Sequence, residues 1–232
     1  MIRGVIFDLD GTLADTLESI AYCTNRALSD FGFAAIGTKR FKRFVGDGAR
    51  MQVARALRAA GDAEGAGRLP FPDSDGFWTA PVHLETVYDR YMRYFEKDCM
   101  YRVVPYAGIL ELLKKLRERG ILTAVCSNKP HPNTQKVLAD LFPGYAFDAV
   151  QGQEEGLPRK PAPDGVWRIL EKLSLKREET LYVGDSGVDM DTGTAAGLRT
   201  IGVLWGFREK EELLAHRADA LIAEPMQLLS LI

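Results

Sequence analysis

Two aspartates near the start of the chain carry the clearest chemical signal. Asp8 and Asp10 follow a short apolar segment, Arg3–Phe7, that we expect to be a strand, and they lead into Gly11 and Thr12. The like charges of two neighbouring carboxylates oppose ionisation unless a cation binds or one acid keeps its proton. A hard divalent cation such as Mg²⁺ prefers carboxylate and carbonyl oxygens. The segment therefore predicts a metal site at a strand end, although paired acids before a glycine also occur in surface turns and calcium loops.

The motif Asp-x-Asp-Gly-Thr at residues 8–12 is the signature of the haloacid dehalogenase superfamily, most of whose members are phosphatases. Three further motifs of that superfamily follow in the expected order, and each is carried by polar side chains: Ser127, Lys160, and the pair Asp185 and Asp189. Each of these has a simpler explanation by itself, as a helix cap, a solvated lysine or the end of a strand. Together and in order, they make the chain resemble the superfamily closely over residues 2–205.

The composition sets broad limits on the class of protein. A chain of 232 residues suffices for one large domain, or for a core with a smaller partner. Hydrophobic residues make up 46% and charged residues 27%, as is ordinary for a globular protein. The formal net charge of −2 creates no strong field for nucleic acid or a membrane surface. We therefore expect no nucleic-acid partner and no membrane partner.

The start of the chain and its cysteines bear on the compartment. No apolar run approaches the roughly 20 residues that span a bilayer. Met1 lies so close to the first expected strand that no room is left for a signal peptide. Three cysteines, at positions 23, 99 and 126, show no metal-like spacing and favour reduced thiols. We expect a cytoplasmic protein.

The order of the predicted elements indicates how the site is positioned. From Gly108 onward, strand-like and helix-like segments alternate, which predicts a parallel sheet with helices on both faces. Ligands in such α/β folds bind beyond the carboxyl ends of the strands. Asp8, Ser127 and Asp185 all follow predicted strands, so one crevice should hold them. The expected fold is α/β, with a Rossmann-like parallel sheet core and an inserted α-helical cap domain.

The insertion is the stretch that interrupts this alternation. Residues 16–101 read as helical, with apolar residues near period 3.6 in Leu17–Phe31 and again in Leu84–Phe95. Gly61–Pro81 is rich in glycine, proline and aspartate and predicts a long loop. An insertion of this size resembles the superfamily's helical cap, although it could be a purely stabilising subdomain. We expect a core domain of residues 1–15 and 102–232, joined by hinges to a cap domain of residues 16–101.

The resemblance implies hydrolysis of a phosphate monoester through an aspartyl-phosphate. Asp8 would attack phosphorus, and Asp10 would protonate the leaving oxygen and later deprotonate the attacking water. Mg²⁺ would be held by the groups that the motifs supply: the Asp8 carboxylate, the Asp10 carbonyl, Asp185 and Asp189. The phosphoryl oxygens would be gripped by Ser127, the amide of Asn128 and Lys160, with close backbone approach at Gly11. Dehalogenases of the superfamily lack an acid at the place of Asp10, so its presence favours phosphoryl chemistry.

Two local patterns resemble phosphoglycolate phosphatases and indicate a small phosphorylated metabolite as substrate. One is Ser127–Pro130, and the other is Phe44–Arg50, which is similar to a Gly-x-Gly substrate loop at the start of a cap helix. Free backbone N–H groups there suit an anion, and Arg50 could clamp a carboxylate through its planar fork. We expect 2-phosphoglycolate as the substrate. A solvated helix face is an equally simple reading of Arg50 and the basic run Lys39–Arg43.

Several alternatives stay open at this point. A pyrophosphatase, a sugar-phosphate phosphatase, a nucleotide-directed phosphatase or a phosphomutase would use the same core. A phosphonate hydrolase would need a cap lysine for a Schiff base, and neither Lys39 nor Lys42 stands out. A binding module that had lost turnover would have no need of Asp10.

Overall fold

The computed structural model describes residues 1–63 and 83–232, which form two compact units. The core unit comprises residues 1–16 and 103–232, and the helical unit comprises residues 17–102. The chain therefore crosses between the units after residue 16 and again after residue 102.

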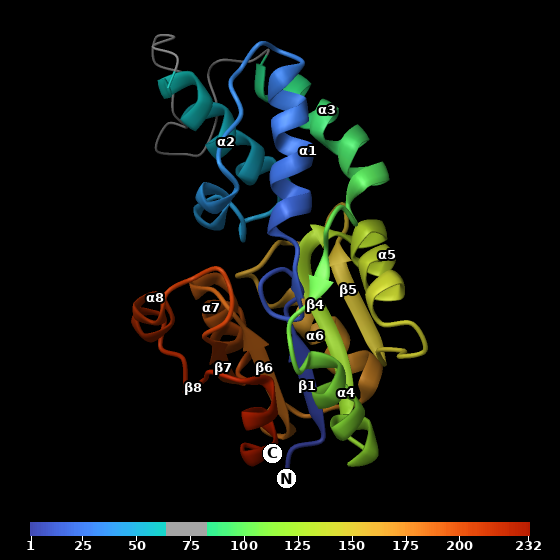
Figure 1. Cartoon of the computed structure of the whole chain (residues 1–232). Coiled ribbons are helices and arrows are strands. Elements are labelled where there is room, and N and C mark those ends of the chain that lie inside the picture. The colour runs from blue at the N-terminus through green and yellow to red at the C-terminus, as the bar shows by residue number, and fades with distance from the viewer. Residues whose placement is uncertain (64–82) are drawn as a thin grey trace. The chain divides into compact units, whose positions relative to one another are not determined.

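A six-stranded sheet forms the centre of the core unit (Figure 1). Its order is β5-β4-β1-β6-β7-β8, and every neighbouring pair is parallel. The strands are β1 (Gly4–Phe7), β4 (Leu122–Pro130), β5 (Ala149–Gln153), β6 (Thr180–Gly184), β7 (Arg199–Val203) and β8 (Ala220–Ile222). The strand order reverses direction at β1, because β4 and β5 lie on one side of it and β6 on the other. Ligands of open α/β sheets bind at such a switch point.

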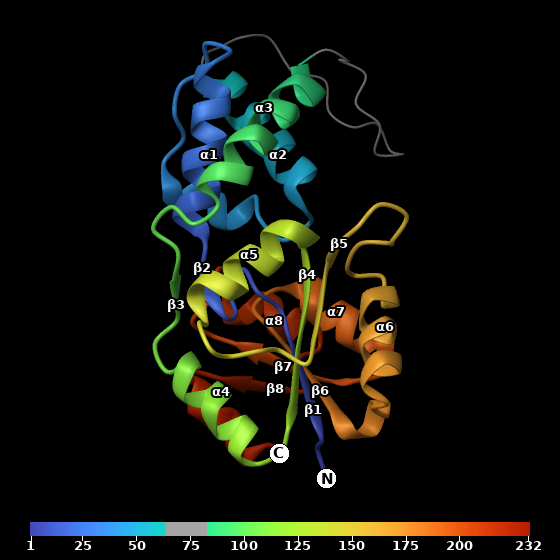
Figure 2. The same ribbon diagram turned by 90° about the vertical axis from the view of Figure 1, so that its right-hand side faces the viewer.

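Helices cover both faces of this sheet (Figure 2). The connecting helices are α4 (Ile109–Glu118), α5 (His131–Leu141), α6 (Asp164–Leu173), α7 (Gly187–Ala196) and α8 (Lys210–Ala215). Right-handed crossovers place α4 and α5 on one face, and α6, α7 and α8 on the other. Two short 3₁₀ helices, η2 (Arg177–Glu179) and η3 (Pro225–Ser230), complete the unit, and η3 packs against α4. The predicted α/β fold with a parallel sheet and helices on both faces is confirmed.

The central strands are apolar because both of their faces are covered. All of β1 and β6 is buried, and Ile6 pairs in register with Ala124 and Tyr182 on its two neighbours. These side chains pack with apolar residues of α6 and α7, including Val166 and Ile169, in one cluster. Parallel sheets are stabilised by such two-sided burial, and it holds the carboxyl ends of β1, β4 and β6 in a fixed relation.

A second, two-stranded sheet lies where the core unit leads into the crossings. β2 (Ala14–Asp15) pairs antiparallel with β3 (Val104–Pro105), and the Tyr106 N–H donates to the Leu13 carbonyl. These segments were expected to be hinges, and no strand was predicted in them, because pairs as short as this carry little sequence signal. The pairing holds the two ends of the insertion side by side within the core unit.

The helical unit contains α1 (Leu17–Ser29), η1 (Thr38–Arg43), α2 (Ala49–Ala63) and α3 (His83–Asp98). α1 packs against the other three, and α2 packs against α3. The loop predicted for Gly61–Pro81 is wrong at its start, since α2 continues through Gly61 to Ala63. The rest of that predicted loop lies outside the described residues. Cys23 and Cys99 are buried thiols of this unit.

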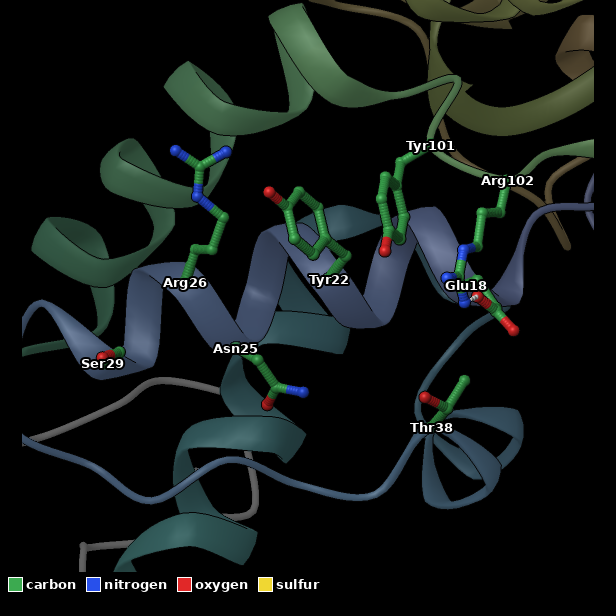
Figure 3. Close-up of a pocket in the computed structure, with 8 residues that line it drawn as sticks. All are labelled: Glu18, Tyr22, Asn25, Arg26, Ser29, Thr38, Tyr101 and Arg102. Carbon is green, nitrogen blue, oxygen red and sulfur yellow. Dashed lines mark hydrogen bonds and ion pairs between the residues drawn. The ribbon is translucent and has the colours of Figure 1, made fainter.

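A groove of about 400 Å³ lies along one face of α1 (Figure 3). The rings of Tyr22 and Tyr101 stack there with centroids 4.1 Å apart. Arg102 pairs with Glu18 at 3.1 Å, and Arg26 donates to Asp98 at 2.5 Å. These charged groups form ion pairs with one another. The groove is therefore a polar surface of paired charges, and we do not assign it as a catalytic site.

Among residues 1–63 and 83–232, no helix is both long and apolar enough to cross a membrane.

Candidate active site

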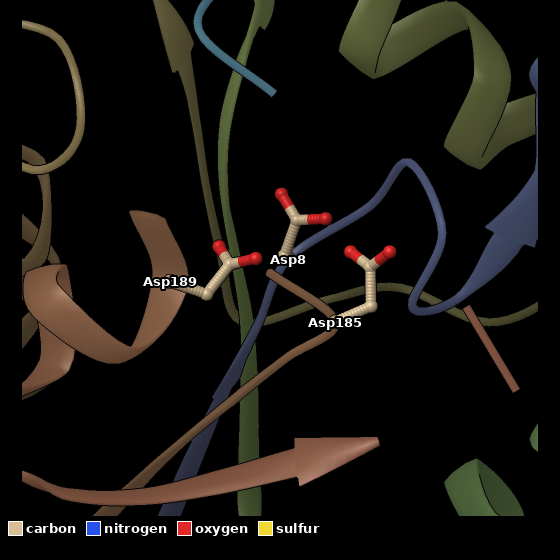
Figure 4. Close-up of side chains that lie close together, drawn as sticks. All are labelled: Asp8, Asp185 and Asp189. Atoms are coloured by element: carbon tan, nitrogen blue, oxygen red, sulfur yellow. The ribbon is translucent and has the colours of Figure 1, made fainter. Parts of the chain in front are cut away.

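Three carboxylates meet at the carboxyl ends of β1 and β6 (Figure 4). Asp8 directly follows β1, Asp185 follows β6, and Asp189 lies in the first turn of α7. One carboxylate oxygen from each lies within 4.8 Å of the others, and all three residues are buried. The parallel sheet explains the meeting, because the Asp8 N–H donates to the Val183 carbonyl and so joins the two strand ends.

The spacing of Asp185 and Asp189 follows from the start of α7. Asp185 ends the strand segment, and Ser186 is the N-cap of the helix. Asp189 is the third helical residue, and its Oδ2 accepts from both the N–H and the hydroxyl of Ser186. Such a capping box satisfies backbone donors that a helix start leaves unpaired. It also fixes the second acid of the motif against the first turn.

Lys160 joins two of the three acids. Its Nζ lies 2.6 Å from Asp8 Oδ1 and 2.7 Å from Asp189 Oδ1, and its side chain is 5% exposed. Burial acts to lower the pKa of Lys160, but the neighbouring charges of Asp189 and Asp8 raise it well above the usual value. The lysine therefore stays charged. It offsets one of the buried negative charges.

The remaining negative charge fits a cation. Burial raises the pKa of Asp8 to about 7, with Lys160 opposing this rise and the charges of Asp189 and Asp10 adding to it. Burial and the charges of Asp189 and Asp8 raise the pKa of Asp185, whose Oδ2 accepts from the Phe207 N–H at 2.7 Å. Three buried carboxylates against one ammonium are stable as charged groups only if a cation joins them. An all-oxygen donor set of this kind suits a hard divalent ion.

Asp10 has a lysine of its own. Lys129 Nζ lies 2.6 Å from Asp10 Oδ1, and the two side chains are 3% and 13% exposed. No role was predicted for Lys129 from the sequence. The sequence carried no clear signal for this contact, since Ser127 was expected to follow the strand, whereas β4 continues to Pro130.

Asn128 and Ser127 lie at the end of β4, which continues to Pro130 rather than ending at Cys126 as expected. The Asn128 side chain accepts from the Lys160 N–H at 2.9 Å and donates to the Lys160 carbonyl at 3.1 Å. The Ser127 hydroxyl accepts from the Lys129 N–H at 3.2 Å. This segment therefore connects both lysines of the site to one rigid strand.

Gly11 lies against the acid cluster. Its φ of +99° falls in a region that side chains with a Cβ avoid, and a Cβ there would lie 2.3 Å from Asp185 Oδ2. The motif therefore needs glycine both for the turn after Asp10 and for the approach of backbone to Asp185.

Arg50 lies in the helical unit, in the first turn of α2. Its guanidinium donates to Glu85 Oε1 on α3 through both Nε and Nη2. The Gly-x-Gly loop before it has a positive φ at both Gly46 and Gly48, of 121° and 86°. The loop thus has the backbone conformation that glycine permits, and the candidate carboxylate clamp is held by an acid of its own unit.

Comparison with known proteins gives the family. The model of the haloacid dehalogenase-like hydrolases matches residues 5–203. A phosphoglycolate phosphatase of Pectobacterium atrosepticum is 31% identical over 231 residues, covering 100% of this chain and 92% of its own length. A phosphoglycolate phosphatase of Rhodospirillum rubrum is 33% identical over 207 residues, covering 89% of this chain and 81% of its own.

A solved structure from Lactobacillus delbrueckii subsp. bulgaricus, assigned as a phosphoglycolate phosphatase, has the same fold. It superposes with a TM-score of 0.89 at 31% identity and covers 99% of this chain and 98% of its own. The match spans both the motifs and the inserted helices. The chain therefore belongs to the haloacid dehalogenase-like hydrolase family, and it is an enzyme of the phosphatase type.

Proposed function

We propose that this enzyme hydrolyses a small phosphate monoester, with 2-phosphoglycolate as its substrate, by way of an aspartyl-phosphate and with Mg²⁺ as cofactor. The observation that carries the proposal is the buried group of Asp8, Asp185 and Asp189 with Lys160 between two of them. The proposed nucleophile, the proposed cation site and a fixed positive charge thus lie together where β1 and β6 end.

Asp8 is the proposed nucleophile. A carboxylate in line with phosphorus needs no separate base to form a covalent intermediate. Asp10 donates a proton to the departing oxygen and then takes one from the attacking water, which contributes roughly 10²–10⁴-fold in comparable enzymes. Lys160, the Ser127 hydroxyl and the Asn128 amide bind the phosphoryl oxygens. Because Gly11 has no side chain, the backbone at this residue can approach the phosphoryl group closely.

The residues proposed to hold Mg²⁺ are the Asp8 carboxylate, the Asp10 carbonyl, Asp185 and Asp189. The buried oxygen set described above fits a hard cation. Bound there, Mg²⁺ would neutralise charge that develops on the phosphoryl group. Asp189 also accepts from Lys160 through Oδ1 and from Ser186 through Oδ2, so the same carboxylate holds Lys160 in place.

One observation supports 2-phosphoglycolate in particular. Relatives that carry the name phosphoglycolate phosphatase match the chain over nearly its whole length. We propose further that the helical unit is a cap that selects the substrate, and that Arg50 binds the carboxylate of a substrate in exchange for Glu85. A guanidinium fork suits both partners.

The test is phosphate release in the presence of Mg²⁺ across 2-phosphoglycolate, pyrophosphate, sugar phosphates, nucleotides and phosphonoacetaldehyde. We expect a strong preference for 2-phosphoglycolate and no turnover by Asp8→Asn. The Asn variant keeps the shape of the side chain but lacks the nucleophilic oxygen charge.

The outcomes separate the parts of the proposal. Broad, weak hydrolysis that is abolished in Asp8→Asn would support the aspartyl-phosphate mechanism and contradict 2-phosphoglycolate as the substrate. Turnover that survives in Asp8→Asn would contradict the assignment of Asp8 as the nucleophile. Absence of activity on every compound would remove the catalytic assignment altogether.

A further inference from the structure

The ion pair between Lys129 and Asp10 has no part in the scheme above. Lys129 Nζ contacts Asp10 Oδ1 at 2.6 Å, and the lysine side chain is 3% exposed. An ammonium so deeply buried is costly unless an acid pairs with it. The pair is therefore a built feature of the site rather than a surface contact.

The backbone of Lys129 is fixed on both sides. Its N–H donates to the Ser127 hydroxyl, and its carbonyl accepts from the Thr134 hydroxyl at 3.2 Å. Gly152 on β5 packs closely here, since a Cβ on it would lie 2.9 Å from the Lys129 carbonyl oxygen. Lys129 thus extends from a rigid strand end, whereas Asp10 lies in the turn that follows β1.

We propose that Lys129 is a positioning residue that acts through Asp10: it holds Oδ1, so that Oδ2 faces the ester oxygen and exchanges the proton there. The inference rests on the proposed function. When the bond from Asp8 to phosphorus forms and the ester P–O bond breaks, the leaving oxygen takes the bonding electron pair and the proton from Asp10. A misplaced carboxyl makes that transfer slow, because general acids work only within hydrogen-bond reach.

This role predicts a dependence on the leaving group. The ratio kcat/KM reports steps up to departure of the leaving group, and a phenolate with electron-withdrawing substituents departs without a proton, whereas an alkoxide does not. Loss of Lys129 should therefore reduce kcat/KM for alkyl phosphates far more than for p-nitrophenyl phosphate. A residue that merely keeps the fold intact would affect both esters alike.

The experiment measures kcat/KM for 2-phosphoglycolate, ethyl phosphate and p-nitrophenyl phosphate with the Mg²⁺-loaded enzyme. The variants are Lys129→Met, Lys129→Arg, Asp10→Asn and the double variant Asp10→Asn with Lys129→Met. Lys136→Met is the matched control, because Lys136 forms an exposed pair with Asp140 on α5. Circular dichroism and thermal unfolding establish that each variant folds.

For Lys129→Met we expect a loss on both alkyl esters at least tenfold larger than the loss on p-nitrophenyl phosphate. Lys129→Arg should retain part of the activity that Lys129→Met loses on the alkyl esters. In the Asp10→Asn background, Lys129→Met should cause little further loss of kcat/KM. Equal losses on all three esters, or additive losses in the double variant, would overturn the inference. A loss confined to 2-phosphoglycolate would also overturn it, since Lys129 would then bind the substrate carboxylate.

If Lys129→Met does not fold, Lys129→Arg by itself still tests the inference, because it keeps the charge and changes the position of the hydrogen-bond donor. It should then show the same leaving-group dependence to a smaller degree. The proposed function is tested separately, since p-nitrophenyl and ethyl phosphate report on Asp10 whatever the natural substrate is. Turnover by Asp8→Asn would contradict the proposed function and not this role of Lys129.

Discussion

Lys160 reaches Asp8 across 152 residues of sequence, with its Nζ 2.6 Å from Oδ1. Both side chains are buried, at 5% and 8% exposure. The contact depends on the loop after β5 returning to the end of β1, where the Asn128 side chain holds the backbone of Lys160. The contact thus joins two segments that lie far apart in the sequence.

Replacing Lys160 by Met should abolish turnover and destabilise the protein. Removing one partner of a buried ion pair typically costs about 3–5 kcal/mol, because a buried charge is left uncompensated. We expect phosphate release to fall by at least a thousandfold and urea to unfold the variant at lower concentration. Lys136→Met serves as the control and should change neither. A variant that keeps more than a tenth of the activity would contradict the role given to Lys160.

Removing the divalent ion should stop the reaction reversibly. Dialysis against EDTA is expected to abolish phosphate release, and added Mg²⁺ should restore it. Asp185→Asn should raise the Mg²⁺ concentration for half-maximal activity by more than tenfold, because a charged ligand is lost. Asp191→Asn is the matched control, since Asp191 lies on α7 but pairs with His216. Equal Mg²⁺ requirements in the two variants would remove Asp185 from the metal site.

Replacing Arg50 by Ala tests the substrate carboxylate. We expect KM for 2-phosphoglycolate to rise about tenfold, the equivalent of roughly 1.4 kcal/mol, while KM for ethyl phosphate stays the same. Glu85→Gln should lower KM for 2-phosphoglycolate, because Glu85 competes for the same guanidinium. Arg93→Ala is the control, as an exposed arginine of α3. A rise of equal size for both esters would exclude carboxylate binding by Arg50.

Cys126 should make stability depend on pH in the alkaline range. Burial raises the pKa of its thiol from 9.0 to about 11. In the unfolded chain the thiol ionises first, so its contribution to stability is full below pH 9 and is lost as the pH rises through 11. The contribution is of the order of 3 kcal/mol, from two pKa units at about 1.4 kcal/mol each.

Urea unfolding of the wild type and Cys126→Ala at pH 8 and pH 10.5 measures this contribution. The wild type should lose more stability between the two pH values than the variant does. Native Cys126 should also resist iodoacetamide at pH 8 and react once the chain is unfolded. Identical pH dependence in the two proteins would show that the thiol ionises at its ordinary pKa.

Site residues could be predicted from the sequence where a polar side chain comes directly after an apolar strand. Asp8 and Asp185 follow strands of a parallel sheet as predicted, whereas Ser127 lies within β4 near its carboxyl end. Apolar strands between helices of period 3.6 are strong local signals, since both elements bury their faces in the same core. The spacing of Asp185 and Asp189 was visible in sequence, but its cause, the capping box of Ser186, became clear only in the structure.

Contacts across the sheet were not predictable in the same way. The link from Lys129 to Asp10 depends on β4 continuing to Pro130 beside Gln153, where the register of the β4–β5 pair shifts. The pairing of Arg50 with Glu85 depends on how α2 packs against α3, which no periodicity specifies. Both contacts depend on tertiary packing, which leaves little signal in a single sequence.

The pairing of Ala14–Asp15 with Val104–Pro105 has a consequence for how such an enzyme diversifies. The chain leaves the core unit and re-enters it at adjacent points, so an insertion of any length can be exchanged there without rerouting a strand. Loop-closure entropy grows only slowly with the length of an insertion, so the core tolerates replacement of residues 17–102 at small cost. The core unit and the inserted helical unit can therefore change independently in evolution, although one gene encodes both.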